Sequence, residues 1–169
     1  MTGTDQQMEA IKRAIQMEKD GRAFYLKAAA QTSSRMGREI FDSLANDELL
    51  HLDTFQKIFE KKVGKDEWDQ LVNTSKKYAD LNVFPKDLKA IDGAHPETDE
   101  LDALNVAMEA EKEAIEFYGT ILQETDDPVI KDIIHEIIQQ ERNHYTLLNE
   151  EFTYLGSSGH WYDVGPLGA

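Results

Sequence analysis

The sequence predicts an all-α protein, a four-helix bundle made of two similar antiparallel helical hairpins that a long, partly helical crossover joins. Three observations predict this class. Only 4 prolines and 10 glycines interrupt the 169 residues, apolar residues recur at helical spacing in four long segments, and the first two segments resemble the last two at a fixed offset. A chain of this length can bury the core of one ordinary domain.

The first half of the chain predicts one helical hairpin. Thr4 begins a capping-box pattern, which indicates an amphipathic helix over residues 5–30. The polar residues 31–34 predict a turn. Apolar residues then recur at helical spacing again, and we expect the second helix to stop near Val63 and Gly64.

The second half begins after a segment in which the helical signal weakens. Residues 64–97 contain several proline and glycine breakers and predict the crossover. Thr98 is a candidate cap for the third helix, and its carboxyl end is expected near Glu124.

The fourth helix has a clear predicted start. Asp127 offers an N-cap and Pro128 suits the first helical position. The apolar pattern continues to about Leu155, and Gly156 is a plausible stop. We therefore assign the bundle to residues 1–155 and a C-terminal tail to residues 156–169.

The most informative feature is an internal repeat with an offset of 93 residues, which holds across both predicted turns without a gap. Each copy carries one glutamate and, 30 residues later, a Glu-x-x-His motif whose two side chains share a helix face. Each predicted turn lies midway between its two glutamates, so all four carboxylates are expected at one level. The matched pairs are Glu18 and Glu111, Glu48 and Glu141, and His51 and His144.

These six polar residues lie on apolar stripes, where leucine or isoleucine would be expected. In the last helix, Glu141 and His144 interrupt a seam that runs from Ile130 to Phe152. Buried unpaired carboxylates are costly and repel one another, so cations must compensate them. Two divalent metal ions would balance four carboxylates. A metal-free bundle with these residues exposed is the alternative, but it does not explain two motifs in register.

The available ligands restrict the metal. The chain has no cysteine, which excludes thiolate ligands, disulfides and a cysteine nucleophile. Oxygen and imidazole ligands suit two iron ions, with manganese or zinc as alternatives. Iron is preferred because an open, redox-capable site is its usual use. We expect His95, His135 and His160 to take no part, and His135 to be a structural residue beside the core.

Charge and hydropathy exclude several classes of partner. The chain has 33 acidic and 18 basic residues and a net charge of -15, which would repel nucleic acid and anionic membrane surfaces. The sequence shows neither a signal-peptide pattern nor an uncharged apolar stretch long enough to cross a bilayer. We therefore expect a cytoplasmic protein.

One glutamate on each first helix and a Glu-x-x-His motif on each second helix resemble the ferritin-like di-iron carboxylate superfamily. The two similar hairpins, the long crossover and the short chain most resemble its rubrerythrin-like branch, over about residues 5–155. The resemblance implies one histidine ligand per metal, terminal ligands at Glu18 and Glu111, and bridging ligands at Glu48 and Glu141.

The chain departs from that family pattern in two ways. Rubrerythrins carry a cysteine-ligated iron domain that this chain does not contain, so an external electron-donor protein is expected. Rubrerythrins also place a further glutamate three residues after the ligand on the third helix, where this chain has Ala114. The repeat equivalent is Gly21. Glu109 and Glu113 are expected to face away from the ligand face and do not replace it.

The resemblance implies an oxidoreductase that reduces peroxide or dioxygen, with a role in oxidative stress, and we expect peroxide to react faster. Tyr25 and Tyr118 lie two turns beyond the first glutamate of each hairpin. They are candidate catalytic residues that can bond ligand carboxylates or mediate electron transfer, and core packing is the alternative. An iron-binding ferroxidase or iron-storage protein and a metal-stabilised structural bundle stay open as functions. A homo-oligomer, such as a dimer, is expected.

Overall fold

The computed structural model describes residues 3–64, 66 and 96–162, and these residues form four α-helices and no strand. The predicted all-α class is therefore confirmed. The helices are α1 (Gly3–Gln31), α2 (Arg35–Val63), α4 (Pro96–Glu124) and α5 (Pro128–Ser158).

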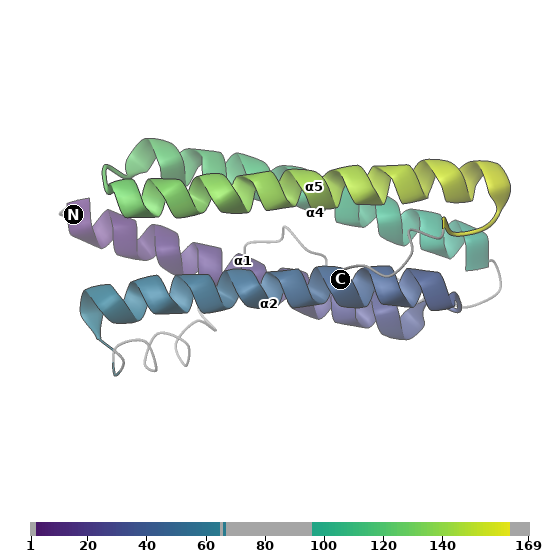
Figure 1. Cartoon of the computed structure of the whole chain (residues 1–169), viewed down its shortest axis with the longest axis horizontal. Coiled ribbons are helices and arrows are strands. Elements are labelled where there is room, and N and C mark those ends of the chain that lie inside the picture. The colour runs from purple at the N-terminus through teal and green to yellow at the C-terminus, as the bar shows by residue number, and fades with distance from the viewer. Residues whose placement is uncertain (1–2, 65, 67–95, 163–169) are drawn as a thin grey trace.

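The helices form two antiparallel hairpins that lie side by side (Figure 1). α1 packs along α2 and α4 along α5, and the hairpins meet where α1 contacts α4 and α2 contacts α5. α2 ends at one end of the bundle and α4 begins at the other, so these two helices run in the same direction (Figure 1). The ferritin-like bundle of two hairpins is confirmed. The crossover predicted over 64–97 lies outside the described residues, apart from its two ends.

Side-chain caps fix the start of the second helix in each hairpin. Ser34 is the N-cap of α2, and its hydroxyl accepts a hydrogen bond from the Gly37 amide at 3.2 Å. Asp127 caps α5 as predicted, because its carboxylate accepts from the Val129 amide at 2.9 Å. Pro128 occupies the first position of α5, where its missing N–H has no cost.

Two predicted helix starts were wrong by a few residues. α1 begins at Gly3, so Thr4 lies inside its first turn and not at the cap. α4 begins at Pro96, so Thr98 also lies inside a first turn. Proline is tolerated at this place because the first amides of a helix have no partner within the helix.

The predicted end of α5 was also too early. Gly156 continues the helix, which ends at Ser158, because Gly159 adopts the left-handed conformation that terminates it, with φ of 71°. The Gly159 amide donates to the Leu155 carbonyl at 2.9 Å. The first three residues of the predicted tail over 156–169 are therefore helical.

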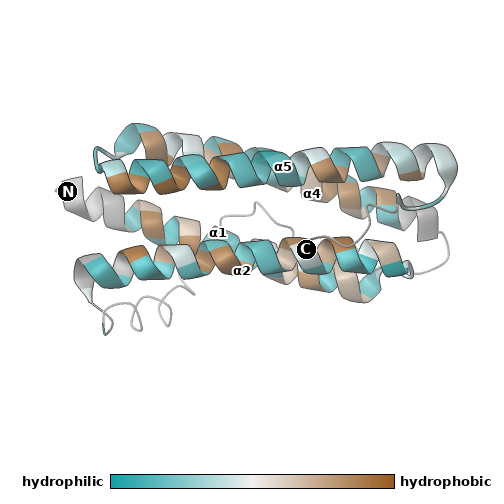
Figure 2. Cartoon of the chain, in the orientation of Figure 1, coloured by the Kyte–Doolittle hydropathy of each residue, from teal (hydrophilic) through white to brown (hydrophobic). Residues whose placement is uncertain are grey.

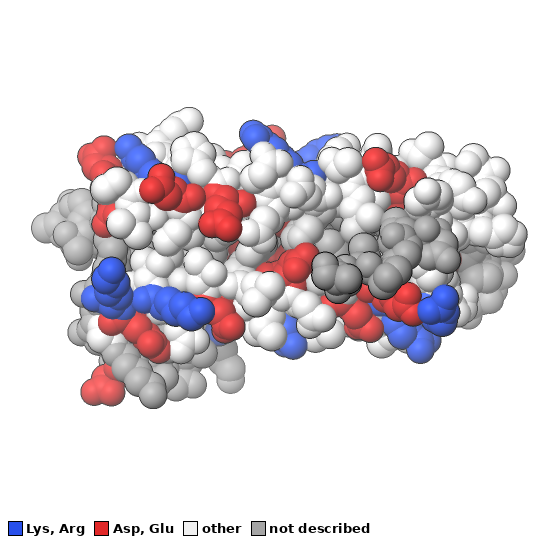
Figure 3. All heavy atoms as spheres, in the orientation of Figure 1, with Lys and Arg blue, Asp and Glu red and all other residues white. Residues whose placement is uncertain are grey.

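Hydrophobic and hydrophilic residues alternate along each helix (Figure 2), as expected for helices with one buried face. The buried faces form one apolar core that includes Ile15, Leu44, Leu104 and Ile134. Acidic and basic side chains both lie on the outer face shown in Figure 3. None of the helices that the structure describes is both long and apolar enough to cross a membrane.

Candidate metal centre

The six side chains that the repeat singles out lie together in the interior of the bundle, and each residue is at most 6% exposed. Their ligand atoms form two groups of four, and within each group the atoms lie within 4.8 Å of one another. The two groups share two glutamates. The first group contains Glu18, Glu48, His51 and Glu141, and the second contains Glu48, Glu111, Glu141 and His144.

The common level of these side chains follows from the local structure of the hairpins. Ser33 lies in the turn between α1 and α2, and Asp126 lies in the turn between α4 and α5. Each turn is midway between the two glutamates of its hairpin, as predicted, so the glutamates of two antiparallel helices meet at one height.

The two histidines present the same nitrogen, Nδ1, to the carboxylates. His51 Nδ1 lies 3.0 Å from Glu18 Oε2 and 3.4 Å from Glu141 Oε1. His144 Nδ1 lies 2.9 Å from Glu141 Oε2 and 3.6 Å from Glu111 Oε1. Nδ1 is therefore the atom that each imidazole can offer to an ion.

The other nitrogen of each imidazole contacts a polar side chain of the opposite hairpin. His51 Nε2 lies 2.9 Å from Gln140 Oε1 on α5. His144 Nε2 lies 3.1 Å from Asp47 Oδ2 on α2. An acceptor at Nε2 keeps the proton on that atom and leaves the Nδ1 lone pair free for a metal. Sequence reasoning missed both acceptors, although each directly precedes a repeat glutamate.

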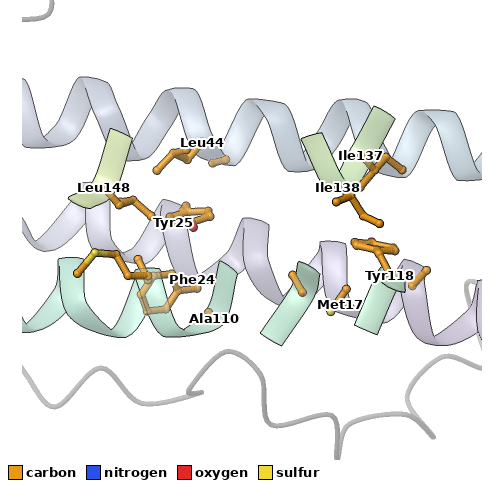
Figure 4. Packing of buried hydrophobic residues seen from close by; sticks show 14 of the residues in the cluster. Met17, Phe24, Tyr25, Leu44, Ala110, Tyr118, Ile137, Ile138 and Leu148 are labelled. Carbon is orange, nitrogen blue, oxygen red and sulfur yellow. The ribbon is translucent and has the colours of Figure 1, made fainter. Parts of the chain in front are cut away.

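Two tyrosines donate hydrogen bonds across the bundle to Glu111 and Glu18, the glutamates of α4 and α1. Tyr25 donates a hydrogen bond to Glu111 Oε1, and Tyr118 donates to Glu18 Oε1. Each tyrosine thus reaches the glutamate of the other hairpin. Both tyrosines also pack in the core, each stacked on a phenylalanine, and Figure 4 shows them apart along the bundle among apolar side chains. Their catalytic assignment stays a prediction.

Burial and crowding of charge shift the protonation of the site. Burial and the neighbouring glutamates raise the pKa of Glu48 well above its usual value. Burial and the charge of Glu141 raise the pKa of Glu111 to about 8. Burial would lower the pKa of His144, but hydrogen bonds to Asp47 and two glutamates raise it to about 12. Protons thus compensate the carboxylates when no cation does.

The donors present do not satisfy every carboxylate oxygen. Glu111 Oε2 is buried and has no hydrogen-bond partner, although an unpartnered buried oxygen is costly. A cation between the carboxylates would satisfy it. Each group offers three carboxylates and one imidazole, a ligand set that iron, manganese and zinc accept. The residues therefore fit two divalent ions that share Glu48 and Glu141.

Other acidic and imidazole groups lie away from this centre. Glu109 and Glu113 are exposed, as predicted, and Ala114 is buried. His135 is exposed, so its predicted place beside the core was wrong, because it lies on the outer face of α5. His160 is also exposed. His95 lies outside the described residues.

The start of the tail packs on its own bundle. Trp161 Nε1 donates to Glu100 Oε2 at 2.6 Å, and Thr32 Oγ1 donates to Glu100 Oε1 at 2.5 Å. The Tyr162 amide donates to the buried Glu151 at 3.0 Å. Sequence reasoning did not single out Glu100 and Glu151 as buried glutamates, because neither belongs to a motif.

Comparison with known proteins agrees with this architecture. The family model described as rubrerythrin matches residues 9–152, which include all six residues of the centre. No curated protein matches the chain in sequence. A solved structure, of a hypothetical protein from Pyrococcus furiosus, is 23% identical and has a TM-score of 0.70 over 92% of this chain and 93% of that chain, a likeness that shows the fold. The chain belongs to the rubrerythrin family.

Proposed function

We propose that the chain is a non-haem di-iron oxidoreductase that reduces peroxide with electrons from an external donor. The observation that carries the proposal is the pair of four-residue groups that share Glu48 and Glu141. Membership of the rubrerythrin family supports iron as the metal. Two ferrous ions, when bound, supply the two electrons that convert one peroxide and two protons into two waters.

In this proposal, the residues of the chain hold the pair of ions and shield it from bulk water. Glu48 and Glu141 lie within reach of both positions and would keep the ions close together. Tyr25 and Tyr118 fix the terminal glutamates through their hydrogen bonds. Burial, followed by the charge of Glu111, raises the pKa of Tyr25 well above its usual value, so this hydroxyl stays a neutral donor. The apolar core around these groups excludes bulk water.

The reductant in this proposal is a separate protein. The chain has no cysteine and so has no thiolate ligands for an iron centre that could deliver electrons internally. We propose a small external electron-donor protein and a dimeric assembly of the chain. Sizing of the purified protein tests the assembly, because an iron-storage shell would be far larger than a dimer.

Stopped-flow reoxidation of the ferrous protein tests the proposed reaction. The anaerobically loaded protein is mixed with hydrogen peroxide in one experiment and with dioxygen in another, and the ferric absorbance is followed. We expect peroxide to react faster. Faster reaction with dioxygen would favour the ferroxidase alternative. No reaction with either oxidant would contradict both and leave a structural metal site.

A further inference from the structure

The two proposed metal positions have ligands of the same types, but their histidines have different hydrogen-bond partners. The position that contains Glu18 and His51 is called the His51 position, and the one that contains Glu111 and His144 the His144 position. The repeat exchanges them, because each has one terminal glutamate, one histidine and the same two shared glutamates. Any difference between the positions must therefore come from beyond these ligands.

Asp47 and Gln140 break this equivalence. They are partners in the repeat, 93 residues apart, and each accepts a hydrogen bond from the Nε2 atom of a ligand histidine of the other hairpin. Asp47, at the His144 position, provides a carboxylate, whereas Gln140, at the His51 position, provides a neutral amide. The acceptor of the histidine Nε2 hydrogen bond is thus negatively charged at the His144 position only.

The charge of the acceptor has a definite effect on the metal. A carboxylate that accepts from the outer nitrogen makes the imidazole a stronger ligand and also attracts the cation. The hydrogen bonds are 3.1 Å long to Asp47 and 2.9 Å long to Gln140, and both lengths are ordinary. The Asp47 side chain is 39% exposed, which weakens its field through solvent but leaves the hydrogen bond in place. The difference in charge therefore dominates.

We propose that Asp47 is a positioning residue that makes the His144 position the tighter of the two. The first divalent ion to enter would then bind Glu111 and His144 with the shared glutamates, and the second would bind at His51. This inference rests on the proposed metal centre. Mutation of such an outer partner typically weakens metal binding by roughly 10- to 100-fold. Asp47→Asn keeps an acceptor and removes its charge, so we expect it to weaken the His144 position by roughly 10-fold, the lower end of that range.

Zinc titration of the metal-free full-length chain tests the order of filling. Zinc is diamagnetic, so the imidazole ¹⁵N signals of both histidines can be followed by NMR as it is added. We expect the His144 signals to change over the first equivalent and the His51 signals over the second. Simultaneous changes, or changes in the opposite order, would overturn the inference.

An exchange of the two acceptors provides the decisive variant. In the double variant Asp47→Asn with Gln140→Glu, the charge moves to the other position and the net charge is unchanged, so we expect His51 to respond first. An unchanged order would overturn the role of Asp47. The control Asp42→Asn removes the same charge from an exposed site on α2 and should keep the natural order. Asp47 and Gln140 are both partly exposed, so folding, checked by circular dichroism, should be retained.

The same titration separates two kinds of failure. If the chain binds no zinc at these histidines, the metal centre itself is wrong and the inference is overturned with it. If two zinc ions bind in another order, the metal centre stands and only the role of Asp47 is overturned.

Discussion

The Glu100 carboxylate and the four carboxylates of the candidate metal centre are all buried, but their hydrogen-bond partners differ. Near the turn between α1 and α2, both oxygens of Glu100 accept hydrogen bonds from protein donors, the Thr32 hydroxyl and the Trp161 indole. In the candidate metal centre, four carboxylates share two histidines and two tyrosines, and Glu111 Oε2 has no partner. A single buried glutamate therefore does not indicate a metal, even where one of its oxygens has no partner, as at Glu151 Oε1. A shortage of donors around several buried glutamates does.

The largest expected effect is the loss of metal when a shared carboxylate is removed. Glu141 belongs to both groups of ligands, so Glu141→Ala should abolish binding of at least one ion of the pair. Elemental analysis of protein loaded with ferrous iron and desalted measures this. Glu113→Ala, which changes an exposed glutamate on α4, is the matched control and should keep both ions. Retention of two ions by the Glu141 variant would contradict the assignment.

The crowded carboxylates of the candidate metal centre should make its metal affinity depend on pH. In the metal-free chain the pKa values of Glu111 and His144 are raised, to about 8 and about 12, so both groups hold protons at neutral pH. Metal ions must displace these protons, so affinity should rise with pH, by roughly tenfold per unit for each proton released. Manganese titrations at pH 6 and pH 8 measure the effect. Equal affinity at the two values would contradict it.

The Glu100 region should affect stability and leave metal binding unchanged. Trp161→Phe keeps an aromatic ring but leaves Glu100 Oε2 without its donor, which should cost about 1–3 kcal/mol of unfolding free energy. Urea unfolding measures this cost, and the metal content should stay the same. Tyr162→Phe is the control, because Tyr162 is 51% exposed. Loss of metal in the Trp161 variant would mean that the two regions are coupled.

The smallest effect is expected at the tyrosines. Tyr25→Phe removes the donor to Glu111 Oε1, but in the metal-loaded protein a bound ion would still satisfy this carboxylate. We expect the variant to lose about 0.5–1.5 kcal/mol of unfolding free energy and to retain both ions. Tyr118→Phe should have a matching effect, because it removes the equivalent hydrogen bond to Glu18. Thermal unfolding of the two metal-loaded variants measures both losses of stability. A large difference between them would show that the two tyrosines do not have equivalent roles in the two repeats.

The sequence was sufficient to predict the fold and the grouping of the six side chains. The repeat fixes which residues correspond, and the turns at Ser33 and Asp126 set the height of the glutamates within each hairpin. The two Glu-x-x-His motifs then meet because the hairpins pack with these levels aligned. The assignment of these residues as metal ligands stays a prediction.

The remaining contacts depend on how the hairpins pack, which local patterns do not encode. Asp47 and Gln140 contact histidines of the opposite hairpin. Their role therefore depends on how α2 and α5 are oriented relative to each other, which the local sequence does not give. Trp161 docks beside Gly37, where an added Cβ atom would lie 2.7 Å from the indole ring. In the sequence, Gly37 is only a weak helix former, and its role as space for the tail becomes visible only in three dimensions.

Anomalous diffraction from crystals of the protein loaded anaerobically with ferrous iron tests the proposed metal centre most directly. Data collected on both sides of the iron absorption edge locate iron independently of the surrounding density. We predict two iron peaks roughly 3.5–4 Å apart, both within reach of Glu48 and Glu141, with His51 at one and His144 at the other. The absence of iron between these residues, or iron bound only elsewhere on the chain, would contradict the proposed centre and the redox function that rests on it.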